Sequence, residues 1–194
     1  MRILYIYCHP LPESFHAAIR KEVLRALNDA GHQVDLLDLY AEEFDPVLSE
    51  EGRRHYHDVS RNRTGLDDYI ARLTSAEALI LQFPTWCFGL PAMLKGFFDR
   101  MIMPGVAFDL SDPAHVKPTL RNIKRIVGIV TYGRPRYMAL WMSDPPRKIV
   151  KRYVHWFTGG KARTDYYALY HLNVATDAQR AAFMAKIARA MRRL

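Results

Sequence analysis

The chain is poor in cysteine, with only Cys8 and Cys87 among its 194 residues. Each lies beside an apolar run, so a disulfide framework is not expected and a reducing cytoplasm suits both thiols. No apolar run approaches the roughly 18 residues that a membrane-spanning helix needs. The N-terminal apolar stretch is too short for a signal peptide and lacks a small-residue cleavage pattern. We therefore expect a cytoplasmic protein without membrane insertion.

Several motifs of nucleotide-binding and hydrolytic proteins are missing. Residues 8–16 read CHPLPESFH, which contains neither the glycine fingerprint of dinucleotide-binding proteins nor a P-loop. The paired acids of a phosphoryl-accepting receiver are also absent from this loop. The chain has no G-x-S-x-G nucleophile elbow, and its histidines show no metal-ligand spacing. A receiver, a common α/β-hydrolase and a metal site are all disfavoured.

Acidic residues are almost absent between Lys117 and Arg163, where Asp144 is the only one. The whole chain carries a formal net charge of +8 at pH 7. Such a segment attracts anions, and a phosphorylated cofactor, an anionic membrane and nucleic acid would all qualify. A basic solvated face without a partner is equally compatible with the charge. No helix-turn-helix, RRM or zinc pattern accompanies it, which disfavours a nucleic-acid-binding protein.

Short β-rich runs alternate with amphipathic helical patterns along one domain, residues 1–194. The predicted strands are 2–8, 34–39, 78–83, 125–131 and 166–172. Helices are predicted at 14–28, 66–74, 91–103, 144–157 and from 177 to the C-terminus, whereas 42–64 is predicted as loop with at most a short helix. Five strands alternating with helices predict an α/β, doubly wound five-stranded parallel sheet with helices on both faces.

In such sheets ligands bind beyond the carboxyl ends of the strands, near the point where the strand order reverses. After the first predicted strand, Ser14 begins a helix close to His9 and His16. A helix N-terminus attracts anions and a serine hydroxyl can donate to a phosphate oxygen, so this loop suits a phosphate. The alternative is that Ser14 is only an N-cap and His9 only a loop histidine.

The third predicted strand continues into an aromatic loop, FPTWCFGLPAMLKGFFDR at 83–100. Its aromatics, braced by prolines and a glycine, would form a rigid apolar wall beside free backbone amides. Such a wall can hold a flat ring and hydrogen-bond the polar edge of that ring. Aromatic side chains in this setting also occur as ordinary core residues, and that alternative stays open.

Together with His9 and Ser14-Phe15-His16, the 83–100 run resembles the flavodoxin-like NAD(P)H:quinone oxidoreductases. This family includes animal quinone reductases, bacterial quinone reductases and potassium-efflux ancillary proteins, and the resemblance extends more weakly over nearly the whole chain. It implies a flavodoxin-like fold with strand order 2-1-3-4-5. It also implies FAD, or FMN as the close alternative, with NAD(P)H as electron donor. Hydride would pass to flavin N5 and then, in a ping-pong sequence, to a quinone or similar small acceptor.

The resemblance also assigns residues. Those matching flavin contacts are His9, Ser14, Phe15 and His16 on the phosphate and ribityl side, Pro84, Thr85, Trp86, Cys87 and Phe88 along the isoalloxazine, and Thr131, Tyr132, Gly133 and Arg134 at the pyrimidine edge. Arg180 resembles an arginine that meets the adenosine diphosphate of FAD, which favours FAD over FMN. The residues expected at the reacting centre are Trp86, Phe108 and Tyr137. Phe108 matches an aromatic that closes the pocket of the other subunit, which implies a homodimer with the active site at the interface.

The chain departs from the family pattern after the fourth predicted strand. Tyr137 matches a tyrosine that assists hydride transfer, but no histidine follows it between Met138 and Arg147, where the family often has one. Arg134 could stabilise negative charge on the reduced flavin, or be a solvated cation. An alternative function from another class is a flavin-binding electron carrier or redox-sensing subunit that regulates a partner such as a channel.

Overall fold

A five-stranded parallel sheet forms the centre of the computed structural model, which describes residues 1–194. Its strands lie in the order β2-β1-β3-β6-β7, which confirms the predicted order with β6 and β7 as the fourth and fifth strands. Their bounds are β1 Arg2–Tyr7, β2 Gln33–Asp38, β3 Ala78–Pro84, β6 Arg125–Thr131 and β7 Arg163–Leu169. A small antiparallel ribbon, β4 Phe108–Asp109 and β5 Lys117–Pro118, was not predicted.

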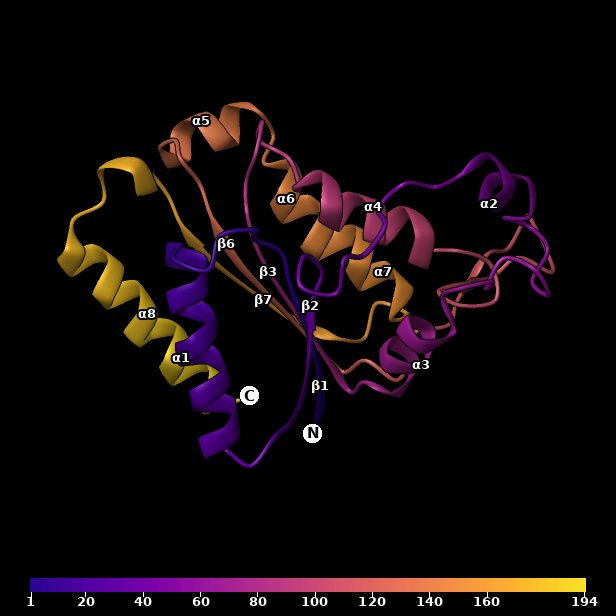
Figure 1. Ribbon diagram of the computed structural model, residues 1–194, viewed down its shortest axis with the longest axis horizontal. Helices are drawn as coiled ribbons and strands as arrows, with labels where there is room; N and C mark the ends of the chain where they lie inside the picture. Colours follow the sequence, from indigo (N-terminus) through magenta and orange to yellow (C-terminus); the bar gives the residue numbers. More distant parts are fainter.

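Helices cover both faces of the sheet (Figure 1). α1 Phe15–Asp29 and α8 Asp177–Met191 lie on one face, and the other face carries α3 Asp67–Ser75, α4 Ala92–Met101, α6 Pro145–Lys148 and α7 His155–Phe157. A π-helical segment, Ile149–Val154, joins α6 to α7, so the predicted helix at 144–157 is one continuous helical stretch. Two short helices, α2 Glu50–Arg54 and α5 Arg136–Trp141, lie outside these layers. None of the helices has the length and apolar character to span a bilayer.

Side-chain alternation along β1 divides the interior into two cores. Ile3, Tyr5 and Tyr7 pack beneath α1 and α8, whereas Leu4 and Ile6 face the α3 and α4 side. All seven residues of β3 are buried, as expected for a central strand covered on both faces. The sheet is therefore rigid in its middle, where the carboxyl ends of β1, β3 and β6 lie side by side.

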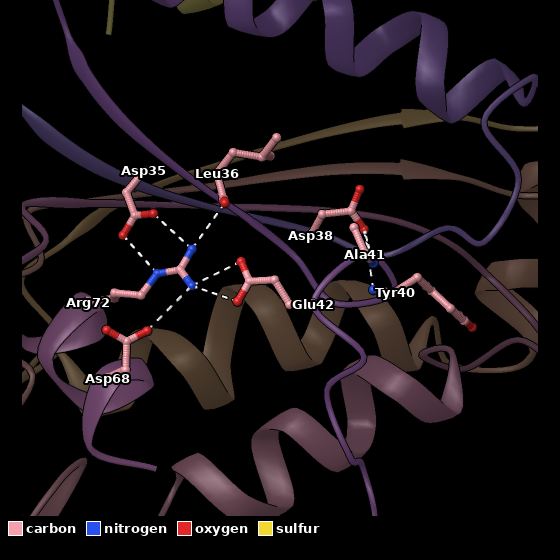
Figure 2. A network of polar contacts seen from close by, with 8 residues as sticks. All are labelled: Asp35, Leu36, Asp38, Tyr40, Ala41, Glu42, Asp68 and Arg72. Atoms are coloured by element: carbon pink, nitrogen blue, oxygen red, sulfur yellow. Dashed lines mark hydrogen bonds and ion pairs between the residues drawn. The ribbon is translucent and has the colours of Figure 1, made fainter. Parts of the chain in front are cut away.

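Arg72 of α3 anchors the outer strand β2 to the neighbouring loop (Figure 2). Its Nε and Nη2 bond both carboxylate oxygens of Asp35 at 3.0 and 2.8 Å, and its Nη1 meets both oxygens of Glu42 at 3.0 and 2.8 Å. Its Nη2 also donates to the carbonyl of Leu36 at 3.0 Å. A bidentate guanidinium pair fixes direction as well as distance, so Arg72 holds α3 in a set orientation at the edge of the sheet.

The bounds predicted for the last strand were wrong, and one short helix was not predicted. The last strand was expected at 166–172 but spans Arg163–Leu169, because its regular pairing with β6 runs only from Arg125 to Thr131. Past the strand, His171 turns the chain with a φ of 59°. The prediction also placed no element between Pro135 and Asp144, where α5 lies.

Candidate functional site

Three loops meet at the carboxyl ends of β1, β3 and β6, the point where the strand order reverses. The ring of His9 in the first loop lies 6.2 Å from that of Trp86 in the second, centroid to centroid. The second loop bonds to the end of β6 through Thr85 N and Thr131 O at 2.8 Å. The sequence prediction that these loops are neighbours is therefore confirmed in space.

The first loop presents the N-terminus of α1. Ser14 caps the helix by accepting the Ala17 amide at 3.1 Å, which leaves its own hydroxyl hydrogen free to donate. His9 Nδ1 accepts the Leu11 amide at 3.1 Å, so its Nε2 carries the ring hydrogen. Burial lowers the pKa of His9, which keeps the imidazole neutral. The loop offers neutral donors at the positive end of a helix, which suits a phosphate.

The His16 side chain does not face the ligand side of the loop, because it is buried and only 2% exposed. Its Nδ1 accepts from Gln82 Nε2 at 3.1 Å, and its Nε2 therefore donates to Thr131 Oγ1 at 2.8 Å. Gln82 Oε1 in turn accepts the hydroxyl of Tyr5. Burial, with a smaller contribution from His9, lowers the pKa of His16 to about 3. The imidazole is thus a neutral link between α1, β3 and β6, and only its backbone faces the first loop.

The second loop is a tight hairpin turn from Trp86 to Gly89. Gly89 N donates to Trp86 O at 2.8 Å, and Cys87 and Phe88 have φ of 50° and 56°. Two consecutive positive φ values are typical of a type I′ turn, and the amides of both central residues have no acceptor in the chain. Trp86 is 42% exposed and the Cys87 thiol is also exposed. Non-glycine residues held in this conformation are costly and concentrate at functional sites.

The third loop leaves β6 at Thr131. The Tyr132 side chain points into the core, 1% exposed, so only its backbone belongs to the loop surface. Gly133 and Arg134 follow, and a Cβ on Gly133 would lie 3.3 Å from Asn173 Nδ2. Arg134 is exposed and forms no ion pair.

Each loop contributes backbone amides that find no acceptor within the chain. Among them are the amides of Phe15 and His16, of Cys87 and Phe88, and of Gly133 and Arg134. Polar groups on a flat heterocycle bearing a phosphate would complete this donor set, so the residues present fit a flavin. Arg180, at the start of α8, adds a buried Nε without an acceptor. Its Nη1 bonds only Asp177, at 3.3 Å.

The residues expected at the reacting centre divide into two groups. Trp86 lies in the second loop, and Tyr137 lies on α5, directly after the third loop and 69% exposed. Phe108 lies elsewhere, packed on Phe157 with ring centroids 6.0 Å apart. Figure 1 shows the segment between α4 and β6 at the side of the molecule, away from α5. Phe108 therefore does not join the three loops of its own chain.

Sequence reasoning missed Gln82, which connects Tyr5 to His16. The signal was present, because Gln82 is the one polar residue in the otherwise apolar run at 78–83. A fully buried polar side chain in a central strand needs hydrogen-bond partners and marks a specified site.

Comparisons with known proteins identify relatives of this chain. Ribosyldihydronicotinamide dehydrogenase (quinone) from Pongo abelii is 31% identical over 125 residues, 56% of this chain and 54% of that relative. The chain thus spans about half the length of the curated relatives it matches. Smu.1420 from Streptococcus mutans UA159 is 31% identical with a TM-score of 0.86, over 100% of both chains. The NAD(P)H:quinone oxidoreductase from Methanothermobacter marburgensis, 22% identical with a TM-score of 0.82 over 99% of this chain and 96% of that one, shares the fold.

The family described by its flavodoxin-like fold matches residues 1–194. The matched residues include all five strands of the sheet and the three loops at the switch point. The chain therefore belongs to the flavodoxin-like fold family.

Proposed function

We propose that the protein is a flavin-dependent oxidoreductase that takes electrons from NAD(P)H and passes them to a quinone or similar small acceptor. The observation that carries the proposal is the set of unpaired amides that three loops bring to the switch point of the sheet. Relatives named as quinone-reducing dehydrogenases support the reaction class. When bound, the flavin supplies two-electron hydride chemistry between a nicotinamide and the acceptor.

The chain's own residues would bind and orient the cofactor. The N-terminus of α1, with the Ser14 hydroxyl and His9 Nε2, would hold the phosphate. The amides of Cys87 and Phe88 would meet the polar edge of the central ring, since neither has an acceptor within the chain. Those of Gly133 and Arg134 would meet the pyrimidine edge, where the unpaired guanidinium of Arg134 stabilises negative charge.

We favour FAD over FMN because of Arg180. Its buried Nε has no acceptor in the chain, and α8, which carries it, packs beside α1, whose N-terminus would hold the first phosphate. A second phosphate reaching towards α8 would satisfy that donor, and FMN has only one. Extraction of the bound flavin identifies which of the two is present.

We further infer that two chains form a homodimer with the site at the interface. Exposed apolar side chains crowd α5, where Trp141 is 81%, Tyr137 69% and Leu140 55% exposed. Apolar patches of this kind on soluble proteins mark contact surfaces. Phe108 is remote from its own loops, and its half-buried side chain would close the pocket of a second copy with its exposed part.

The visible absorption spectrum of the purified protein tests the central proposal. Flavin bands should bleach anaerobically with NADPH and return when benzoquinone is added. Bands that bleach slowly and fail to return would favour an electron carrier or a redox-sensing subunit instead. A colourless protein that binds neither FAD nor FMN would overturn the proposal.

Tyr137 is expected to donate a hydrogen bond to the oxygen of the acceptor. Tyr137→Phe should therefore slow reoxidation by quinone about three- to tenfold, the usual worth of one such bond, and leave flavin content intact. Rapid-mixing reoxidation kinetics give the rate. Tyr69→Phe on α3, at the far end of the molecule, is the control, and equal rates in all three proteins would exclude Tyr137 from the reaction.

A further inference from the structure

The segment that carries α5 has almost no apolar contacts to hold it in place. Ala139 is its only buried helical residue, while Tyr137, Leu140 and Trp141 are all more than half exposed. A helix of this length has little stability of its own, because most helical stability in proteins comes from packing. Within one chain, little hydrophobic burial therefore holds residues 133–143 above the site.

The two ends of this segment are bonded to each other. Tyr132 immediately precedes it and Asp144 immediately follows it, and both side chains are buried, 1% and 4% exposed. The Tyr132 hydroxyl donates to Asp144 Oδ1 at 2.5 Å. We call this hydrogen bond the clasp, since it closes the base of the 133–143 loop.

Three further side chains support the clasp. Arg147 Nε donates to Asp144 Oδ2 at 2.9 Å, which compensates the buried carboxylate, and Arg147 Nη2 donates to the Tyr170 hydroxyl at 2.9 Å. The Tyr132 hydrogen is already given to Asp144, so the Tyr166 hydroxyl donates to the Tyr132 oxygen at 2.6 Å. The Tyr132 ring also stacks on Tyr170, centroids 4.5 Å apart. The clasp is thus fixed in direction as well as position.

The backbone just before the clasp adopts an unfavourable conformation. Ser143 and Asp144 have φ of 64° and 45°, two adjacent non-glycine residues in the left-handed region. Each residue in that region costs roughly 1 kcal/mol unless its surroundings compensate. Two backbone hydrogen bonds, from Ser143 N to Leu140 O and from Asp144 N to Ala139 O, stabilise this turn together with the side-chain bonds of Asp144.

We propose that Tyr132 and Asp144 are positioning residues that hold the 133–143 segment, with Tyr137, over the flavin loops. Neither side chain faces the loop surface, so both act through the segment between them. The consequence for catalysis rests on the proposed function, because an unclasped segment would present Tyr137 in many orientations and weaken binding of the acceptor. The mobility of the segment does not depend on that function.

Tyr132→Phe removes the clasp and keeps the stacked ring, and Tyr166→Phe is its matched control, since it removes a bond to Tyr132 but leaves the clasp. Amide hydrogen exchange, followed by mass spectrometry on flavin-free and flavin-loaded protein, should be about ten- to hundredfold faster within 133–143 for Tyr132→Phe alone. Unchanged exchange there, or equal acceleration in both variants, would overturn the proposal.

Steady-state kinetics provide the second readout. Tyr132→Phe should raise KM for the acceptor more than it lowers kcat, whereas Tyr166→Phe should resemble the parent protein. If Tyr132→Phe does not fold, Asp144→Asn replaces it: the amide still accepts from Tyr132 but no longer pairs with Arg147, so exchange within 133–143 should be intermediate. If the parent protein shows no activity and exchange within 133–143 is fast only in Tyr132→Phe, the proposed enzyme function is wrong and the role of the clasp is supported.

Discussion

At the scale of single residues, His16 does more than its position in the first loop suggests. Its neutral imidazole receives a hydrogen bond from Gln82 and passes one to Thr131, so three elements depend on one protonation state. A protonated ring could no longer accept from Gln82 and would place an unpaired charge in the core. The site is therefore built on a histidine that must stay neutral.

This arrangement predicts a loss of stability in mild acid. The pKa of His16 falls from 6.5 to about 3 on folding, because burial and His9 disfavour the charged ring. Below pH 6.5 the His16 imidazole binds a proton in the unfolded chain but not in the folded chain. The free energy of unfolding should therefore fall by at most about 1.4 kcal/mol per pH unit down to pH 3. Urea unfolding across this range measures the slope.

His16→Gln is the matched variant, since an amide can accept and donate but does not titrate. Its free energy of unfolding should fall less steeply over the same pH range, whatever its absolute stability. Parallel curves for the two proteins would show that another group carries the acid sensitivity.

At the scale of elements, the conformation of the turn from Trp86 to Gly89 sets the positions of the unpaired Cys87 and Phe88 amides. Asparagine tolerates the positive φ at the first central position of a type I′ turn, whereas a β-branched residue does not. Cys87→Asn should therefore raise the free energy of unfolding by up to about 1 kcal/mol and keep flavin binding. Cys87→Val should lower both the free energy of unfolding, measured by denaturant titration, and flavin binding, measured by flavin absorbance. Equal midpoints for the two variants would mean that the turn is not held as described.

How far the sequence predicts an element depends on what stabilises that element. The central strands β1, β3 and β6 are buried apolar runs, and they were predicted within one or two residues. The helix α5 escaped prediction because it buries only Ala139 and is held by Tyr132 and Asp144 from outside its own sequence. The end of β7 was misplaced because pairing with β6, and not the apolar run through Leu172, sets it.

The same reasoning applies to the site. The three loops could be predicted because strand order brings them together, and the aromatic run marks the second. The inward direction of the His16 and Tyr132 side chains could not, since a polar residue after a strand can face either the loop surface or the core. Only the partners Gln82 and Asp144, distant in sequence, decide the direction.

At the scale of the whole molecule, a homodimer would divide each site between two chains. Phe108→Ala should then damage the site of the partner, and Cys87→Val the site of its own chain. A mixed dimer, purified through two different tags after co-expression, would contain one intact site and should regain about half of the parent turnover. If Phe108 served its own chain, both sites of the mixed dimer would be damaged and activity would stay low. Sedimentation of the parent protein first establishes that a dimer forms.

The two cysteines differ in how accessible their thiols are to reagents in the folded protein. Cys8 is buried, and burial raises the pKa of its thiol to about 12, so it stays unreactive in the folded state. Cys87 is exposed at the tip of the turn beside the site. A thiol reagent should therefore modify the folded protein at one place without any engineering, and a bound flavin should slow that reaction because it would cover the turn.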